Sequence, residues 1–229
     1  MAIILYDLAG ADPALRFSPF CWRTRLALAH KGLSVETRPW RFVDKAAIAF
    51  SGSEKVPVIV DGGRVVADSW AIAEYLEEAY PDRPSLFGGD VGRAHARFIN
   101  AWADAALHPA ILRLVVRDVW SVLDPGDQDY FRASREARLG ATLERIVQDR
   151  EARLGAVRQA LEPLRLVLAA SPWLGGEAPS YADHSVFGSL QWPRCVSRPD
   201  LLAGDDPVAA WRGRMLGLFD GLAERAAVA

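Results

Sequence analysis

Residues 56–87, VPVIVDGGRVVADSWAIAEYLEEAYPDRPSLF, contain the signals from which the fold can be predicted. Two β-rich runs, 56–61 and 64–67, flank Asp61-Gly62-Gly63, and such a turn between two strand-like runs indicates a β-hairpin. Asp68 and Ser69 then precede apolar residues on helical spacing, which is typical of the start of a helix. The stretch therefore predicts a hairpin followed directly by a helix.

Upstream of the hairpin, strand and helix signals alternate. The apolar run IILYDL (3–8) and the run SVETRPW (34–40) are candidate strands. Between them, Ser18 and Pro19 form an N-cap and first helical position, and Gly32 is suited to the end of that helix. The first 80 residues therefore predict the order β-α-β-β-β-α.

Downstream of the hairpin, the pattern becomes helical. YPDRPSLFGGD (80–90) contains two prolines and two glycines, which interrupt regular structure. From Val91 to about Arg225 the pattern is helical, with breaks expected at 124–126, 171–179 and 198–207. We predict an α/β domain (1–80), a linker (81–90) and an all-α domain (91–229).

Charge and hydropathy exclude several classes of protein. The net charge is −2 and no Lys/Arg cluster is present, which argues against nucleic-acid binding. No apolar run reaches the roughly 18 residues of a membrane helix, and MAIILYDLAG (1–10) does not have the pattern of a signal peptide. We expect a cytoplasmic protein whose two cysteines, Cys21 and Cys195, are reduced.

Two further features of the chain have an ordinary structural interpretation. Residues 132–165 contain many Arg and Glu residues, which we interpret as a solvated helix face with opposite charges interspersed. The four histidines are scattered, so no metal site is predicted.

Four motifs, in order along nearly the whole chain, resemble those of the glutathione transferase superfamily. They are SPFCWRTRLAL (18–28), KVPVIVDGG (55–63), ADSWAIAEYLEEAYPDRPSLF (67–87) and PSYADHSVF (179–187). The resemblance implies a thioredoxin-like N-terminal domain that binds glutathione and an all-helical domain that contributes the acceptor pocket. Within the superfamily, the chain looks most like the bacterial glutathione-dependent β-etherases, which cleave aryl ethers of lignin fragments, and the related fungal transferases with a Ser-Pro start.

Ser18 and Cys21 are two candidate reactive residues at the first helix. The resemblance implies that the Ser18 hydroxyl donates to the thiolate of bound glutathione, and the helix N-terminus favours an anion at the same place. Redox members of this fold have Cys-x-x-Cys here, but serine replaces the attacking cysteine. We interpret Cys21 as a buried packing residue, with a reactive thiolate as the alternative, and we expect the reacting sulfur to arrive with glutathione.

The resemblance also assigns the glutathione-binding residues. Val56-Pro57 is expected to have a cis bond that leaves the backbone of Val56 free to pair with a peptide ligand. Ser69 and the adjacent helix N-terminus are expected to bind the γ-glutamyl carboxylate, and Asp68 to face the ligand's ammonium. Lys55 is a candidate partner of the glycine carboxylate.

The acceptor pocket is expected between the domains, lined by Phe20, Trp102 and Leu107. Ser180 and Asp183 form a capping-box pattern to which we assign a folding role. Trp22 and Arg23 are expected to make packing and interdomain contacts.

The function predicted from these features is a homodimeric transferase whose glutathione thiolate cleaves a β-aryl ether of a lignin-derived aromatic. Glutathione is a co-substrate, and no metal is expected. Three alternatives stay open: a transferase acting on another small electrophile, a glutathione-dependent isomerase, and a non-catalytic ligand-binding protein.

Overall fold

The computed structural model describes residues 2–197 and 201–229. Its N-terminal domain contains a four-stranded mixed sheet in the order β2-β1-β3-β4. Strand β1 (Ile3–Leu8) pairs parallel with β2 (Val35–Trp40) and antiparallel with β3 (Val58–Asp61), and β4 (Arg64–Ala67) completes the predicted hairpin. This arrangement confirms the expected thioredoxin-like domain.

Two helices of this domain begin where the sequence predicts them. Helix α1 (Pro19–His30) has Ser18 as its N-cap, and Gly32, at φ +64°, follows it in the left-handed conformation that favours glycine. Helix α2 (Ser69–Ala79) is capped by the side chain of Asp68. A 3₁₀ helix, η1 (Lys45–Ser51), lies between β2 and β3.

The C-terminal domain is helical within the described residues, as expected. Its helices are α3 (Asp90–Trp102), a short π-helical segment η2 (Ala103–Leu107), α4 (His108–Ser121), α5 (Pro125–Leu139), α6 (Leu143–Ile146), α7 (Arg150–Ala160), α8 (Glu162–Leu168), α9 (Tyr181–Val196) and α10 (Pro207–Gly221). The predicted breaks at 124–126 and 171–179 fall between helices or at a helix start. The third break begins at 198–200, outside the described residues.

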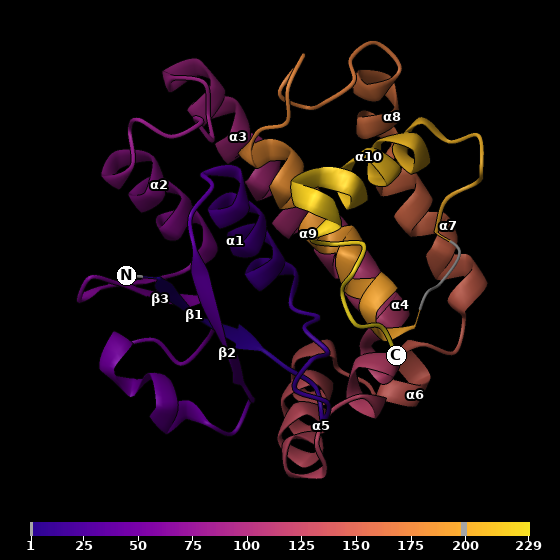
Figure 1. The fold of residues 1–229 in the computed structure, drawn as a ribbon. Coiled ribbons are helices and arrows are strands. Elements are labelled where there is room, and N and C mark those ends of the chain that lie inside the picture. The colour runs from indigo at the N-terminus through magenta and orange to yellow at the C-terminus, as the bar shows by residue number, and fades with distance from the viewer. Residues whose placement is uncertain (1, 198–200) are drawn as a thin grey trace.

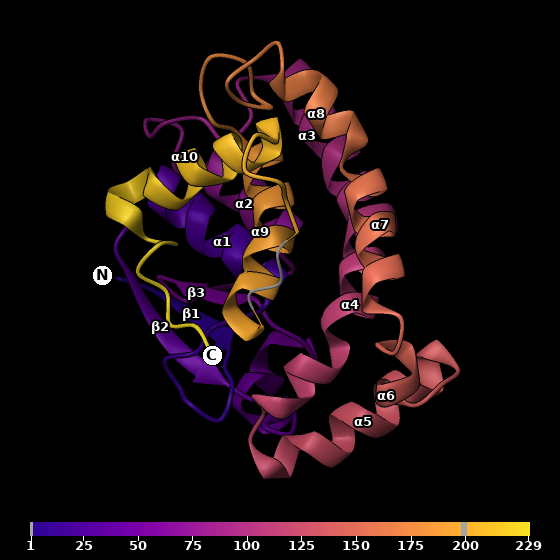
Figure 2. The ribbon, with the colours of Figure 1, turned by 90° about the vertical axis from the view of Figure 1, so that its right-hand side faces the viewer.

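Helix α9 is buried along almost its whole length and packs against α1, so that it joins the two domains (Figures 1 and 2). A Cβ added at Gly188 of α9 would lie 2.4 Å from the carbonyl oxygen of Pro19. The close approach of the two helices therefore requires glycine at this position. It also fixes the end of α1 that carries Ser18.

Arg23 confirms the expected interdomain contact. Its buried guanidinium and Nε donate to the carbonyl of Ser185 (3.1 Å), to Asn100 Oδ1 (3.0 Å) and to Asp104 Oδ1 (2.7 Å). Trp22 is fully buried and its Nε1 donates to the carbonyl of Arg16 at 2.8 Å. Arg23 therefore links α1 to the helical domain, and Trp22 links α1 to the loop that precedes it.

The capping box at Ser180 and Asp183 is present and has the predicted folding role. The buried Asp183 carboxylate accepts hydrogen bonds from the backbone N–H groups of Leu174 and Gly175 and from Trp211 Nε1. One side chain thus joins the segment before α9 to α10. Among the described residues, no helix combines the length and apolar character that crossing a membrane would require.

Candidate active site

A cavity of about 740 Å³ lies between the two domains. The N-terminal domain contributes the start of α1, the Val56-Pro57 turn and Asp68 to its wall. The helical domain contributes mainly apolar and aromatic side chains from α4, α5 and α9, among them His108, Leu112, Tyr130, Phe131 and Trp192. One wall thus presents hydroxyl and backbone groups, and the opposite wall suits an apolar or aromatic molecule.

Ser18 lies on the polar wall, at the N-terminus of α1. Its Oγ accepts a hydrogen bond from the N–H of Cys21 at 3.3 Å, and its side chain lines the cavity. The first turn of α1 contains no acidic residue, so no protein carboxylate in that turn neutralises the positive end of the helix dipole. The place beside Ser18 therefore favours an anion.

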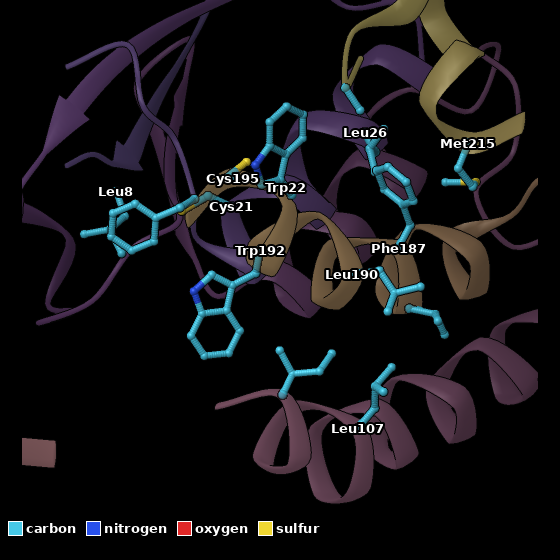
Figure 3. Packing of buried hydrophobic residues seen from close by; sticks show 14 of the residues in the cluster. Leu8, Cys21, Trp22, Leu26, Leu107, Phe187, Leu190, Trp192, Cys195 and Met215 are labelled. Atoms are coloured by element: carbon cyan, nitrogen blue, oxygen red, sulfur yellow. The ribbon is translucent and has the colours of Figure 1, made fainter. Parts of the chain in front are cut away.

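Cys21 follows Ser18 by one turn of α1 and lies in the core beside Leu8 and Trp22 (Figure 3). It is fully buried, and burial, followed by the nearby Asp7 carboxylate, raises the pKa of its thiol well above the usual range. Burial likewise raises the pKa of Cys195 to about 12. A buried, protonated thiol is a poor nucleophile, so the structure favours the packing interpretation of Cys21.

The Val56-Pro57 bond is cis, as the resemblance implied. Val56 precedes β3, and its backbone N–H and C=O form no hydrogen bond with the described residues. Both Val56 and the exposed Lys55 line the cavity. An unpaired backbone edge beside a lysine is suited to an extended peptide that ends in a carboxylate.

Asp68 and Ser69 border the same region from α2. Asp68 has a φ of +81°, unusual for a residue other than glycine, and its Oδ1 accepts from the N–H groups of Trp70 (2.9 Å) and Ala71 (3.1 Å). Asp68 lines both the main cavity and a smaller one of about 280 Å³, which Ser69 also lines together with Arg97 and Asp104. The N-terminus of α2 therefore faces a polar recess next to the main cavity.

Of the three predicted acceptor residues, only Phe20 lines the cavity. Leu107 is fully buried on the core side, where Figure 3 shows it and Leu190 on facing helices, and Trp102 packs partly buried against the core. Trp102 and Leu107 stand at the two ends of the π-helical segment η2 and its wider i→i+5 turns, which the sequence analysis did not predict.

His108, at the start of α4, forms the wall instead. Its ring stacks on Trp192 at a centroid distance of 4.9 Å and an angle of 17°, and lies 5.2 Å from the ring of Phe20. Burial, followed by the charge of Arg23, lowers the pKa of His108 to about 4. This imidazole is therefore neutral at pH 7, and it extends an aromatic surface with Trp192 and Phe20.

Sequence reasoning also missed two cavity residues of α5. Arg135 and Arg138 belong to the charged stretch that we interpreted as a solvated helix face, yet both line the cavity. The one sequence signal is that neither arginine has an acidic residue three or four positions away, whereas Arg132 has Glu136. Among the described residues, no cluster of three or more His, Cys, Asp or Glu side chains is arranged to hold a metal ion.

Comparison with known families is consistent with this geometry. A family model described as "Glutathione S-transferase, C-terminal domain" matches residues 94–221, and "Glutathione S-transferase, N-terminal domain" matches residues 17–79. The chain belongs to the glutathione S-transferase family. As a family member it is assigned to enzymes that use glutathione.

Individual relatives agree with this assignment. A probable glutathione S-transferase, GSTU1, from Oryza sativa subsp. indica is 33% identical over 164 residues, which is 64% of this chain and 68% of the relative. A probable maleylacetoacetate isomerase from Caenorhabditis elegans is 37% identical over 92 residues, which is 38% of this chain and 43% of the relative.

Solved structures of fungal glutathione transferases superpose over nearly the whole chain. GSTFuA3 from Phanerochaete chrysosporium has a TM-score of 0.84 at 30% identity and covers 96% of this chain and 97% of its own. A Ceriporiopsis subvermispora glutathione S-transferase, solved in complex with glutathione, has a TM-score of 0.84 at 27% identity, with the same two coverages. The glutathione S-transferase fold therefore extends through both domains of this protein.

Proposed function

We propose that this glutathione S-transferase uses Ser18 to stabilise the thiolate of bound glutathione, which then attacks an aromatic electrophile. The observation that carries the proposal is a single cavity on which Ser18, the Val56-Pro57 turn, Asp68 and an aromatic wall converge. The unpaired backbone of Val56 and the aromatic wall border one cavity, which supports binding of a peptide beside an apolar acceptor.

Glutathione is expected to bind along the polar wall. The free backbone of Val56 pairs with the cysteinyl part of the peptide, and Lys55 binds the glycine carboxylate. The N-terminus of α2, with Ser69, binds the γ-glutamyl carboxylate. Asp68 uses one carboxylate oxygen to cap α2, which leaves the other for the γ-glutamyl ammonium.

Two effects at Ser18 stabilise the thiolate. The end of the α1 dipole contributes about 0.3–2 kcal/mol toward an anion, and a hydrogen bond from the Ser18 hydroxyl to a charged sulfur adds about 1.5–3 kcal/mol. Because about 1.4 kcal/mol lowers a pKa by one, together they bring a thiol with a pKa near 8.5 into the range where thiolate dominates at neutral pH.

For the acceptor, we propose a β-aryl ether of a lignin-derived aromatic. The thiolate forms a carbon–sulfur bond at the carbon that bears the aryloxy group, the carbon–oxygen bond breaks, and the electron pair leaves on the phenolate. Water then protonates the phenolate, and a glutathione thioether remains. The resemblance of the first-helix and linker motifs to β-etherases supports this choice, as does the aromatic surface of Phe20, His108 and Trp192.

The test is incubation of the purified protein with a β-aryl ether ketone, with and without glutathione. Released phenol and glutathione thioether are measured in the same sample. Equal amounts of the two, formed only with glutathione, support the proposal. Binding of glutathione without release of phenol contradicts the etherase reaction.

A glutathione-dependent isomerase is the second candidate, because a probable maleylacetoacetate isomerase is 37% identical over 92 residues of the chain. An isomerase regenerates glutathione, whereas an etherase consumes it. Incubation with maleylacetone and a catalytic amount of glutathione separates the two. Conversion beyond the amount of glutathione added identifies the isomerase.

We also propose that the protein is a homodimer. Val91 and Phe98 of α3 are 87% and 70% exposed, and their spacing of seven residues places them on one helix face. Exposed apolar side chains grouped on one face are typical of interaction surfaces. Light scattering is expected to give twice the chain mass, and Phe98→Glu is expected to shift the protein toward the monomer.

A further inference from the structure

Arg135 and Arg138 of α5 are two cations on the cavity wall without a carboxylate partner among the described residues. The half-buried guanidinium of Arg135 lies against the neighbouring rings of Phe42 and Phe131, at 5.0 and 4.4 Å from their centroids. Its one hydrogen bond runs from Nη1 to Ser134 Oγ at 2.8 Å. Arg138 forms no ion pair or hydrogen bond with the described part of the chain.

Several other arginines of the protein do have a carboxylate partner. Arg132, one turn earlier on α5, pairs with Glu136 and Glu144 at 2.9 Å each. Arg23 pairs with Asp104 and Arg165 with Asp206. Arg135 is half-buried without an acidic partner, and the exposed Arg138 lines the same cavity wall three residues further along α5. Buried cations in proteins are normally paired with acidic groups, so an unpaired, half-buried cation on a cavity wall points to a ligand that supplies the anion.

The acidic residues that line the cavity do not neutralise Arg135 and Arg138. The two carboxylates on its wall are Glu54, which is bound to Lys45 at 3.1 Å, and Asp68, which caps α2. Both belong to the N-terminal domain. Burial, followed by repulsion from Arg138, lowers the pKa of Arg135 to about 10, which still leaves this guanidinium charged at pH 7. His108, with its low pKa, adds no charge to the wall.

The surroundings of Arg135 indicate which anion would bind. Phe42, Tyr130 and Phe131 lie beside Arg135, with ring centroids of Phe42 and Phe131 5.5 Å apart. A guanidinium that packs against aromatic rings offers in-plane donors that match a planar carboxylate, and the rings offer contact to an aromatic ring that bears it.

We propose that Arg135 and Arg138 bind a carboxylate of the second substrate, so that the acceptor is an aromatic carboxylic acid. The proposal rests on the proposed function in one respect: the cavity has to hold the electrophile as well as glutathione. It deepens that function, because it selects anionic aromatic acceptors over neutral ones.

The test compares two β-aryl ether ketones that differ only in a ring substituent, a carboxylate or the neutral carboxamide. For the wild type we expect kcat/KM to favour the carboxylate by about 10- to 100-fold, since hydrogen bonds between charged groups discriminate to that extent. Arg135→Gln and Arg138→Gln are expected to remove the preference by lowering the rate on the acid alone. Arg135→Lys is expected to retain part of the preference for the acid. The matched control Arg132→Gln, on the same helix, is expected to retain the whole preference.

A competing interpretation is that the arginines bind a carboxylate of glutathione. Titration calorimetry of glutathione with each variant decides between them. An unchanged glutathione Kd in Arg135→Gln supports the proposal. A rise in the glutathione Kd as large as the loss in kcat/KM overturns it, and so does equal use of the acid and the amide by the wild type.

Failure of the etherase reaction leaves the arginine proposal testable by binding alone. Quenching of tryptophan fluorescence by 4-phenoxybenzoate and by 4-phenoxybenzamide is measured with glutathione present. Tighter binding of the benzoate in the wild type, lost in Arg135→Gln, supports the proposal even when neither ether is cleaved. Equal binding of the two compounds overturns it.

Discussion

At the scale of single residues, Ser18 and Cys21 were both candidate reactive residues at the first turn of α1, but they lie in different surroundings. The hydroxyl of Ser18 lines the cavity, whereas the thiol of Cys21 is fully buried one turn further along the helix. Burial keeps the cysteine protonated, and the helix end favours an anion beside the serine. The reacting sulfur is therefore expected to come from the ligand.

Ser18→Ala is expected to reduce kcat/KM by about 10- to 100-fold, because one hydrogen bond to a charged sulfur is lost. It also removes an N-cap, which costs about 1 kcal/mol of stability. Ser180→Ala is the matched control, since it removes the cap of α9 away from the cavity. The control should lose similar stability and keep its kcat/KM. Equal activity of Ser18→Ala and wild type contradicts the role of Ser18.

The two cysteines should be unreactive in the folded protein. Both are buried and have raised thiol pKa values, and the thiolate is the reactive form. Ellman's reagent is expected to find no fast-reacting thiol in native protein and two in denaturant. A fast-reacting thiol in native protein, absent from Cys21→Ala, shows instead that Cys21 is accessible.

At the scale of helices and strands, the contact between α1 and α9 positions the site. Gly188 allows α9 to approach the carbonyl of Pro19, and the Arg23 network holds α1 to α3 and α9. Ser18 lies directly before this contact. A change in the spacing of the two helices is therefore expected to affect stability and activity together.

Gly188→Ala is expected to lower stability by about 1–3 kcal/mol, because the new methyl group meets a backbone oxygen that moves only with its helix. For a chain of this length, that corresponds to a Tm lower by about 2–12 °C. Gly213→Ala is the matched control, since no atom lies within 4 Å of a Cβ at Gly213 in the exposed part of α10. The control should be neutral or slightly stabilised. An unchanged Tm for Gly188→Ala contradicts the close contact.

At the scale of the whole molecule, buried histidines link the stability of both domains to pH. His30 of α1 and His184 of α9 lie 3.0 Å apart between Nδ1 and Nε2, with Phe219 beside both rings. Burial lowers the pKa of both, and each receives a further lowering contribution, His30 from Lys31 and His184 from His30. Glu77 and Asp183 act on His30 in the opposite direction, but the net shift is downward.

A histidine with a lowered pKa in the fold takes up its proton more readily in the unfolded chain. Its contribution to stability is present above pH 6.5 and is lost as the pH falls below that value. For a histidine that stays neutral in the fold, the loss approaches 1.4 kcal/mol for each pH unit, as a rough upper figure. We therefore expect urea unfolding to show a lower free energy of unfolding at pH 5.0 than at pH 7.5.

His184→Gln should reduce this dependence on pH, since the amide does not titrate in this range. His95→Gln, at an exposed position on α3, should retain it in full. Equal dependence on pH in wild type and His184→Gln contradicts a role for the buried pair.

The sequence alone determined the order of the elements, the cap at Ser18, the hairpin at Asp61-Gly62-Gly63 and the glutathione S-transferase motifs. Each of these depends on residues close together in the chain, where caps, turns and hydrophobic spacing act locally. The cis Val56-Pro57 bond was expected from the resemblance to the family's motif and not from local signals. The residues of the polar cavity wall could therefore be predicted from the sequence.

Only the tertiary structure decided the other half of the site. His108, Arg135 and Trp192 come from distant parts of the chain, and no local pattern shows that they share a wall with the expected Phe20. Leu107, the last residue of the π-helical segment, lies in the core, whereas His108, the first residue of α4, lines the cavity. Which charges face the cavity depends on packing between domains, and so the acceptor surface and its unpaired arginines emerged from the fold rather than from the sequence.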